Sequence, residues 1–422
     1  MLPIQLFRQE KELILEGLKK KNFKELDLVD QIIALDEQKR QIQQQSEEAA
    51  AQVNELSKKI GQLMATGQKD EAEKVKNEVA EIKESAKASH EQLTQMEQEL
   101  HDMIIKIPNL PHSSVPFGEK PEDNEIVKIT DNIPELAADA LPHWELTQKY
   151  NLIDFELGNK LTGSGFPVYI HKGARLQRAL ISYFLDYNTA AGYKEYYPPH
   201  MVNEATAYGT GQLPDKEGQM YHITADKFYM IPTAEVPVTN IYRDEIIPIS
   251  DLPIKMTAYT PCFRREAGSY GKDVRGLNRL HQFDKVEIVQ IAQPEDSYQI
   301  LEQMVQHIEQ LLINLELPYR ILRLCGGDMS FTSALTYDFE VYSAAQKRWL
   351  EVSSVSNFEN FQTNRMKIRY RDEDKKVHLS HSLNGSSLAL PRIMACLLEN
   401  NQQPDGIHLP KVLWDYVDKI IN

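Results

Sequence analysis

An alternating four–three spacing of apolar side chains runs through residues 28–63 and returns through residues 75–103. This spacing is typical of the seam of a left-handed coiled coil, in which two helices bury one narrow stripe against each other. Polar residues interrupt the stripe at only three positions, Lys39, Ser46 and Ser89. The repeat therefore predicts two long helices that pack along their seams.

The two predicted helices are separated by a short segment with helix-breaking residues, Gly61–Gly67. Helices joined by so short a turn pack antiparallel, so one chain forms the whole hairpin. At about 1.5 Å rise per residue the first helix would be roughly 50 Å long. A globular domain does not need such an arm for its own stability, so we expect the arm to reach a partner. A structural coiled-coil protein with an unrelated globular end is the alternative, but its seam would pair two parallel chains.

Composition narrows the class of protein. The formal net charge of -15 argues against nonspecific nucleic-acid binding, which depends on Lys and Arg. The arm carries lysines interleaved with glutamates, and charge alone favours a solvated surface there. No apolar run is long enough for a transmembrane helix, and the N-terminus lacks the pattern of a signal peptide. We therefore expect a cytoplasmic protein with no membrane partner.

The three cysteines lie far apart in the sequence, at Cys262, Cys325 and Cys396, and form no CxxC pair. Their spacing argues against a disulfide framework and against a zinc site built on cysteine pairs. No zinc is expected, and isolated thiols are usual in a reducing compartment.

Residues 1–110 are predicted to form an N-terminal helical domain, with the coiled-coil hairpin at about 27–104. A proline-rich stretch beginning at Ile107 marks residues 111–139 as a linker. Residues 140–422 mix short apolar strands with helices, which predicts an α+β domain around a mostly antiparallel sheet. The expected strands cover 227–231, 286–291, 319–324 and 337–342, and the expected helices cover 174–190, 297–315 and 391–401.

One pattern in this domain predicts a strand, a glycine-bearing loop and a returning strand. It begins with Phe263-Arg-Arg-Glu-Ala-Gly268 and returns through His281-Gln-Phe-Asp-Lys-Val-Glu287. Alternate residues on a strand share one face, so one wall would carry an aromatic ring, a cation and a carboxylate, from Phe283, Lys285 and Glu287. The facing wall would carry Arg264 and Glu266. Taken singly, these charges are also compatible with a solvated surface hairpin.

Two further motifs offer ligand groups. The segment Asn384-Gly-Ser-Ser-Leu-Ala-Leu-Pro-Arg392 has small residues that let a ligand approach the backbone, and Pro391 suits the first turn of a helix. A cation at that turn, Arg392, is unfavourable for the helix dipole unless an anion binds there. Glu351 and Ser354 offer oxygen ligands for Mg²⁺, although the same segment alone resembles a polar edge strand.

A proline-braced loop at 232–237 presents Thr233 and Glu235, and a buried carboxylate is a natural partner for an ammonium group. The chain contains neither a Walker A sequence nor a GxGxxG after a strand. If phosphates bind, we therefore expect arginines on a sheet to hold them.

These motifs, in this order, resemble those of the seryl-tRNA synthetases, a family of class II aminoacyl-tRNA synthetases. Residues 263–287 resemble motif 2, residues 384–400 resemble motif 3, and residues 192–199 are similar to motif 1, which forms the dimer interface in that family. The N-terminal hairpin resembles the family's tRNA-binding arm. The resemblance covers essentially the whole chain and implies an antiparallel-sheet class II catalytic domain and a homodimer.

The resemblance implies an aminoacyl-tRNA ligase that activates L-serine with ATP to seryl-adenylate. Serine would then pass to the 3′ end of tRNA(Ser), and also of tRNA(Sec) where that tRNA is present. The implied serine-binding residues are Thr233, Ala234, Glu235, Glu287 and Ser386. The implied ATP-binding residues are Arg264, Arg265, Glu266, Arg275, Phe283, Glu351, Val352, Ser353, Ser354 and Arg392. Arg264 and Arg392 would be catalytic through their contacts with phosphate, and Glu351 and Ser354 would hold Mg²⁺ with ATP.

Two alternatives share much of this pattern. The threonyl and prolyl synthetases are also class II enzymes, but they carry a C-terminal anticodon-binding domain, for which we expect no room here. A catalytically silent paralogue that binds RNA or a carrier protein through the arm is the second alternative. Residues of suitable type at each implied position favour an active enzyme.

Overall fold

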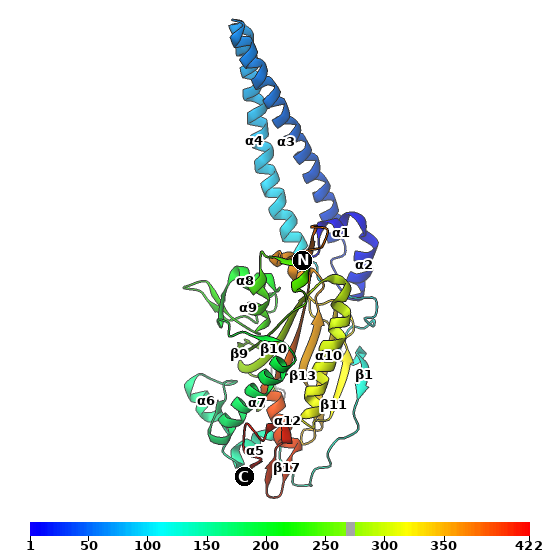
Figure 1. The fold of residues 1–422 in the computed structure, drawn as a ribbon, viewed down its shortest axis with the longest axis vertical. Coiled ribbons are helices and arrows are strands. Elements are labelled where there is room, and N and C mark those ends of the chain that lie inside the picture. The colour runs from blue at the N-terminus through cyan, green and yellow to red at the C-terminus, as the bar shows by residue number, and fades with distance from the viewer. Residues whose placement is uncertain (267–274) are drawn as a thin grey trace. The chain divides into compact units, whose positions relative to one another are not determined.

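A computed structural model describes residues 1–266 and 275–422, and Ala267 and Gly268 of the expected motif 2 lie outside the described residues. The chain divides into two compact units, an N-terminal unit (Met1–Pro108) and a C-terminal unit (Asn109–Asn422). Figure 1 shows the helical N-terminal unit and the sheet of the C-terminal unit. Among the described residues, none of the helices is long and apolar enough to cross a membrane.

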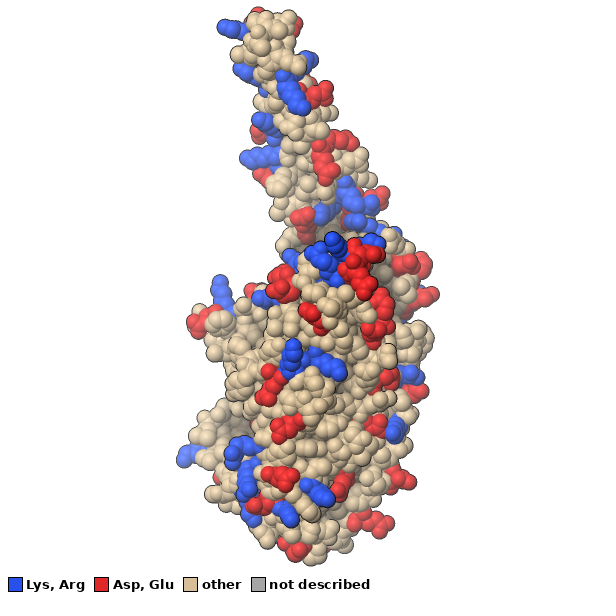
Figure 2. All heavy atoms as spheres, viewed as in Figure 1, with Lys and Arg blue, Asp and Glu red and all other residues tan. Residues whose placement is uncertain are grey.

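The N-terminal unit is a helical hairpin with two short helices that pack near its open end. Its helices are α1 (Ile4–Gln9), α2 (Lys11–Lys20), α3 (Leu28–Ala65) and α4 (Lys69–Ile104). We call the α3–α4 hairpin the arm. Every predicted seam position in the arm is buried or half-buried, while most positions between them are exposed. The predicted coiled coil is therefore confirmed, with the charged side chains of both signs interleaved along its surface (Figure 2).

The turn of the arm is shorter than predicted. Helix α3 continues through Gly61 to Ala65, and only residues 66–68 separate the two helices. Gly67 adopts a positive φ of 79°, and the amide of Gln68 donates to the carbonyl of Leu63 at 2.9 Å. This bond satisfies an orphan carbonyl at the helix end, which a left-handed glycine permits. Gly61 lacks such a role because it lies inside the helix.

A mixed sheet of eight described strands forms the centre of the C-terminal unit. Its order is β1–β11–β12–β13–β16–β10–β9–β4, and all neighbours are antiparallel except β4 and β9. The bounds are β1 (Glu125–Ile129), β11 (Tyr319–Arg323), β12 (Leu335–Ser343), β13 (Arg348–Asn357), β16 (His381–Ala389), β10 (Gln282–Ala292), β9 (Ile254–Phe263) and β4 (Lys194–Glu195). The predicted antiparallel α+β fold is confirmed.

Three helices cover one face of this sheet, namely α7 (His171–Ala190), α10 (Ser297–Asn314) and α12 (Leu390–Asn400). Val286 and Ile288 of β10 pack with them in the main apolar core, so Glu287 between these two residues points to the opposite face. The predicted helices at 174–190, 297–315 and 391–401 match these three within a few residues.

Smaller elements surround the sheet. The helices are α5 (His143–Lys149), α6 (Phe155–Leu161), α8 (Glu204–Gly209), α9 (Glu235–Thr239) and α11 (Phe361–Met366). The short strands are β2 (Ile153–Asp154), β3 (Val168–Tyr169), β5 (Met201–Asn203), β6 (His222–Ile223), β7 (Phe228–Met230), β8 (Ile246–Pro248), β14 (Arg369–Arg371), β15 (Val377–Leu379), β17 (Gln402–Gln403), β18 (Gly406–His408) and β19 (Ile420–Ile421).

Two segments differ from their sequence-based description. Residues 111–139, expected to be a linker, contain β1, which pairs with β11 at the edge of the main sheet. The segment with Glu351 and Ser354 is not an edge strand, because β13 lies between β12 and β16. Local composition did not reveal either arrangement, since β11 lies about 190 residues after β1 and since the second partner of β13, β16, follows only after several intervening elements.

Candidate active site

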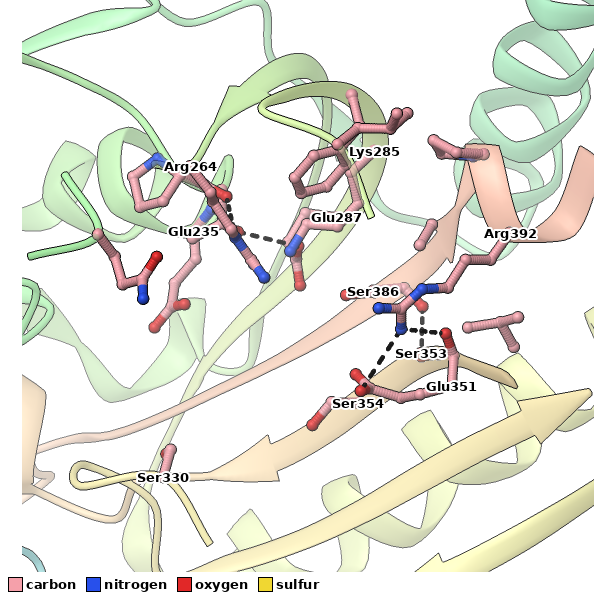
Figure 3. Close-up of a pocket in the computed structure, with 18 of the residues that line it drawn as sticks. Glu235, Arg264, Lys285, Glu287, Ser330, Glu351, Ser353, Ser354, Ser386 and Arg392 are labelled. Carbon is pink, nitrogen blue, oxygen red and sulfur yellow. Dashed lines mark hydrogen bonds and ion pairs between the residues drawn. The ribbon is translucent and has the colours of Figure 1, made fainter. Parts of the chain in front are cut away.

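A cavity of about 700 Å³ opens on the face of the sheet opposite the three helices. Strands β10, β13 and β16, the start of α12 and the loops before α9 and after β9 supply its walls. Figure 3 shows Arg264 and Arg392 entering this space from opposite sides. Twelve of the predicted residues line it: Thr233, Glu235, Arg264, Glu266, Phe283, Glu287, Glu351, Val352, Ser353, Ser354, Ser386 and Arg392.

One end of the cavity holds two buried carboxylates. Thr233 Oγ1 donates a 3.1 Å hydrogen bond to Glu287 Oε2, and Lys285 Nζ lies 2.6 Å from the same oxygen. Ser386 is the direct cross-strand partner of Glu287 in β16 and lines the same cavity. Burial, together with the nearby Glu287 carboxylate, raises the pKa of Glu235 to about 7. This end is therefore suited to a small ligand with an ammonium group and a hydroxyl.

A second layer holds Glu235 in place. Gln362 Nε2 donates to Glu235 Oε1 at 2.6 Å and to the carbonyl of Thr210 at 3.1 Å. Ser382 Oγ donates to Gln362 Oε1 at 2.8 Å, which orients the amide. All of these side chains are buried, so the carboxylate has one well-defined position.

The middle of the cavity carries a stacked pair. Strand β9 ends at Phe263, so Arg264 and Glu266 lie just beyond it rather than on a strand face as predicted. The Arg264 guanidinium nevertheless lies over the Phe283 ring, 5.2 Å from its centroid. Glu266 Oε2 pairs with Arg279 Nε at 2.8 Å. An aromatic face and a guanidinium in one slot suit a flat heterocycle joined to phosphate.

The opposite end is lined by Arg392 at the start of α12, where Pro391 occupies the first turn as predicted. Arg392 Nη1 donates to the carbonyl of Glu351 at 2.6 Å and lies 3.6 Å from its carboxylate. Arg392 Nε donates to the carbonyl of Asn278 at 3.1 Å. These contacts fix the Arg392 cation at the N-terminus of a helix. The cation and the positive end of the helix dipole together favour binding of an anion there.

Glu351 and Ser354 fit a magnesium ion that is shared with a phosphate ligand. Within residues 1–266 and 275–422, no cluster of three or more His, Cys, Asp or Glu residues is arranged to hold a metal ion. Mg²⁺, however, commonly uses one or two protein oxygens and completes its shell with phosphate and water. Asp338, the cross-strand partner of Ser354, has one buried oxygen without a hydrogen-bond partner among the described residues, although it does not line the cavity. Burial and the Glu351 carboxylate raise the pKa of Asp338.

Three predicted residues do not line the cavity. Ala234 is fully buried in a core beneath it, and Arg265 is exposed, with its amide bonded to Gln219. Arg275 is also exposed, and its guanidinium lies 4.5 Å from the centroid of the Trp144 ring. The structure therefore separates these three side chains from the twelve predicted residues that line the cavity.

Sequence reasoning missed several residues that line or support the site. Lys285 was noted as a wall residue but received no role, although its alternation with Phe283 and Glu287 was a usable signal. Asn278 and Asn384 also line the cavity, and Gln362 supports it from behind. Their positions depend on pairings between distant segments, which no local pattern displays.

The comparisons with known proteins agree with this architecture. The family described as "tRNA synthetase class II core domain (G, H, P, S and T)" matches residues 221–401, which contain most of the cavity. The C-terminal unit is therefore a class II aminoacyl-tRNA synthetase core. The "Seryl-tRNA synthetase N-terminal domain" family matches residues 1–111.

Relatives that match the full length of the chain identify its family within the class II aminoacyl-tRNA synthetases. A serine–tRNA ligase from Salinibacter ruber is 50% identical over 418 residues, which cover 99% of this chain and 98% of that protein. The crystal structure of seryl-tRNA synthetase from Pyrococcus horikoshii complexed with ATP matches with a TM-score of 0.93 at 30% identity, covering 99% of this chain and 98% of that one. A cytoplasmic serine–tRNA ligase from Naegleria fowleri, in complex with AMP, gives 0.89 at 27% identity, covering 100% and 99%. The chain belongs to the serine–tRNA ligase (seryl-tRNA synthetase) family.

Proposed function

We propose that the cavity is where L-serine and ATP react to give seryl-adenylate and pyrophosphate. The serine carboxylate attacks the α-phosphorus in line, and the 3′-terminal ribose of tRNA then attacks the adenylate. Such a step needs positioning and charge neutralisation more than a protein nucleophile. The observation that carries this proposal is the pair of buried carboxylates, Glu235 and Glu287, next to an arginine-lined slot.

The charges at the end of the cavity with the two carboxylates indicate how serine would bind there. Glu235 and Thr233 receive the ammonium group, and Glu287 with Ser386 receives the hydroxyl. Lys285 and Thr233 occupy one oxygen of Glu287, so the other oxygen remains to accept the hydroxyl. A buried acceptor left without a donor is costly, and this penalty disfavours alanine.

The stacked pair of Arg264 and Phe283, together with Arg392, indicates how ATP would lie in the rest of the cavity. Phe283 stacks on adenine, Glu266 meets its amino group, and Arg264 binds the α-phosphate. Arg392 binds the γ-phosphate, and Glu351 and Ser354 hold Mg²⁺, which neutralises phosphate charge when bound. Val352 and Ser353 line the same wall. Arg275 remains a proposed triphosphate contact, which would require it to leave Trp144. Arg265 and Ala234 do not line the cavity, and their contacts, with ATP and with serine respectively, stay predictions.

The partners of the two units are also part of the proposal. We infer that the arm binds tRNA(Ser), as its family match supports, and that the enzyme is a cytoplasmic homodimer. Residues 192–199 would form part of the dimer interface, and Tyr197 there is 75% exposed in the single chain. Charging of tRNA(Sec) stays a prediction. The domain limits 1–110, 111–139 and 140–422 also remain proposals for how these functions divide.

Serine-dependent ATP–pyrophosphate exchange tests the adenylation site directly. The wild-type protein should exchange with serine and not with threonine, alanine or no amino acid, before any tRNA is added. The Glu287→Ala variant should lose exchange by about 10³-fold or more, since the site rejects ligands whose hydroxyl it cannot pair.

Glu295→Ala is the matched control, because Glu295 is exposed and lies outside the cavity. It should exchange at the wild-type rate. Retained exchange in Glu287→Ala would remove Glu287 from the serine site, and no exchange by a folded wild-type dimer would overturn the proposed reaction.

A further inference from the structure

Behind the ATP half of the cavity lies a fully buried histidine–carboxylate pair that the proposed reaction does not use. His143 at the start of α5 and Glu399 near the end of α12 are both 0% exposed. His143 Nδ1 lies 2.7 Å from Glu399 Oε1, and neither residue lines the cavity. The pair joins two segments that are 256 positions apart in the sequence.

The hydrogen bonds define which ring nitrogen of His143 carries the proton. The backbone amide of Leu277 donates to His143 Nε2 at 2.8 Å, so this nitrogen must be the acceptor. A neutral imidazole has one donor and one acceptor, which leaves the proton on Nδ1, where it is donated to Glu399. The carboxylate therefore selects the tautomer that can hold Leu277.

Glu399 is itself held by several donors. Its Oε1 also accepts the backbone amide of His143 at 2.9 Å and Gln346 Nε2 at 3.0 Å, and its Oε2 accepts the hydroxyl of Ser343. A buried carboxylate is stable only when such donors satisfy it. These hydrogen bonds hold the Glu399 carboxylate, and with it the His143 ring, in one position.

The histidine ring lies against the returning end of the motif 2 loop. Gly276 has a positive φ of 64°, and a Cβ atom there would lie 2.2 Å from His143 Nε2. Leu277 and the next residue, Asn278, line the cavity, and the Asn278 carbonyl accepts the hydrogen bond from Arg392 Nε. Displacing this loop end would therefore move the partner of the arginine at the phosphate end.

We propose that His143 and Glu399 are positioning residues that hold Gly276–Leu280 against the cavity and thereby place Asn278 and Arg392 for ATP. The inference deepens the proposed function, since it rests on that function in assigning this half of the cavity to ATP. It gives a role to Glu399 of motif 3, which touches neither substrate. Serine should be affected little, because its carboxylates lie at the other end.

The decisive variant is Glu399→Leu in the full-length dimer. Leucine removes the acceptor of His143 Nδ1–H, of the His143 amide and of Gln346 Nε2, so the ring is no longer held where its Nε2 accepts the Leu277 amide. The KM for ATP in pyrophosphate exchange should rise by about tenfold or more, because small misplacements of a positioning group are costly. The KM for serine should stay within about twofold of wild type.

The tautomer itself provides a readout independent of activity. ¹⁵N NMR of the histidine rings, with His143→Gln used to assign the signal, should show the His143 proton on Nδ1 in wild type. His408 forms an exposed pair with Asp405 at 2.9 Å, so His408→Gln is the matched control and should change neither KM.

Three results would overturn the proposal: a wild-type proton on Nε2, an unchanged KM for ATP in folded Glu399→Leu, or equal losses for both substrates with lower stability. If Glu399→Leu fails to fold, Gly276→Ala tests the same contact, and an unchanged KM for ATP there overturns the proposal too. A wild-type protein without serine-dependent exchange would instead contradict the proposed function, while the NMR result would still test the pair.

Discussion

The arm and the cavity of the C-terminal unit are built by different rules. In the arm, the contacts between α3 and α4 follow a seven-residue repeat, so the neighbours are known once the turn is placed. In the cavity, Glu235, Glu287 and Arg392 come from α9, β10 and α12, and only the strand order brings them together. A periodic pattern thus determines an extended element, whereas a site depends on how distant elements pair.

The two regions also differ in how their apolar side chains are buried. Along most of the arm the seam is half-buried, as at Leu56 and Ile60, whereas Phe339 and Leu397 of the C-terminal core are fully buried. Ion pairs on the arm, such as Lys39–Glu97 at 2.8 Å, are partly exposed and contribute little. The arm is therefore stabilised by many weak contacts between partly buried side chains, whereas the C-terminal unit is stabilised by a fully buried apolar core.

Removing the arm should have the largest effect of the changes predicted. If tRNA charging survived its removal, the division of roles between the arm and the cavity would be wrong. A variant lacking residues 28–103 should keep serine-dependent pyrophosphate exchange near the wild-type rate, because the cavity lies within the C-terminal unit. Charging of tRNA(Ser) should fall by about a thousandfold or more, the effect of losing about 4 kcal/mol of binding. Efficient charging by this variant would show that the arm is not the recognition element.

The next effect, of about tenfold per pH unit, concerns Glu235. Because burial and Glu287 raise the pKa of Glu235 to about 7 in the free enzyme, its carboxyl is protonated below that pH and cannot attract the serine ammonium group. We expect kcat/KM for serine to fall as the pH is lowered through about 7, since this parameter reports the free enzyme.

The control for this pH profile is kcat at saturating serine. Bound serine keeps Glu235 ionised, so kcat should vary much less between pH 6 and 8. A kcat/KM for serine that is constant over this range, in protein that remains folded, would exclude Glu235 as the ammonium partner.

The smallest effect tests the seam of the arm. Leu56→Ala removes a half-buried side chain and should destabilise the arm locally by about 1 kcal/mol. Glu55→Ala, at the exposed neighbouring position, should change it by less than about 0.5 kcal/mol. Hydrogen exchange of the α3 and α4 amides measures both, and amides of β10 should not change. Equal effects of the two substitutions would contradict the assigned seam.

Much of the fold was predictable because its patterns are local. The seam from Leu28 to Met103, the helix beginning near Pro391 and the alternation along β10 each follow from the backbone's own periodicity. The turn was placed too broadly, because Gly61 and Gly67 look alike in sequence, and only Gly67 takes a left-handed conformation.

The candidate site was predictable to the extent that its motifs resemble those of a known family. Spacing alone placed Phe283, Lys285 and Glu287 on one wall, and the structure confirms that all three line the cavity. It did not place Glu235 beside Glu287, or reveal that Lys285 pairs with Glu287. The first of these contacts joins β10 to a segment about 50 residues earlier, and the packing of distant elements decides it. The second lies within β10, where strand alternation puts both side chains on one face but does not show that they pair.

The sequence by itself determined the arm, the antiparallel α+β class and the kinds of side chain available for binding serine and ATP. The tertiary structure alone decided that Thr233 meets Glu287, that β1 pairs with β11, and that His143 meets Glu399 behind the cavity. The physical reason is that helix and strand periodicity repeats every few residues. Contacts across tens or hundreds of residues depend instead on sheet order and on burial of the whole core.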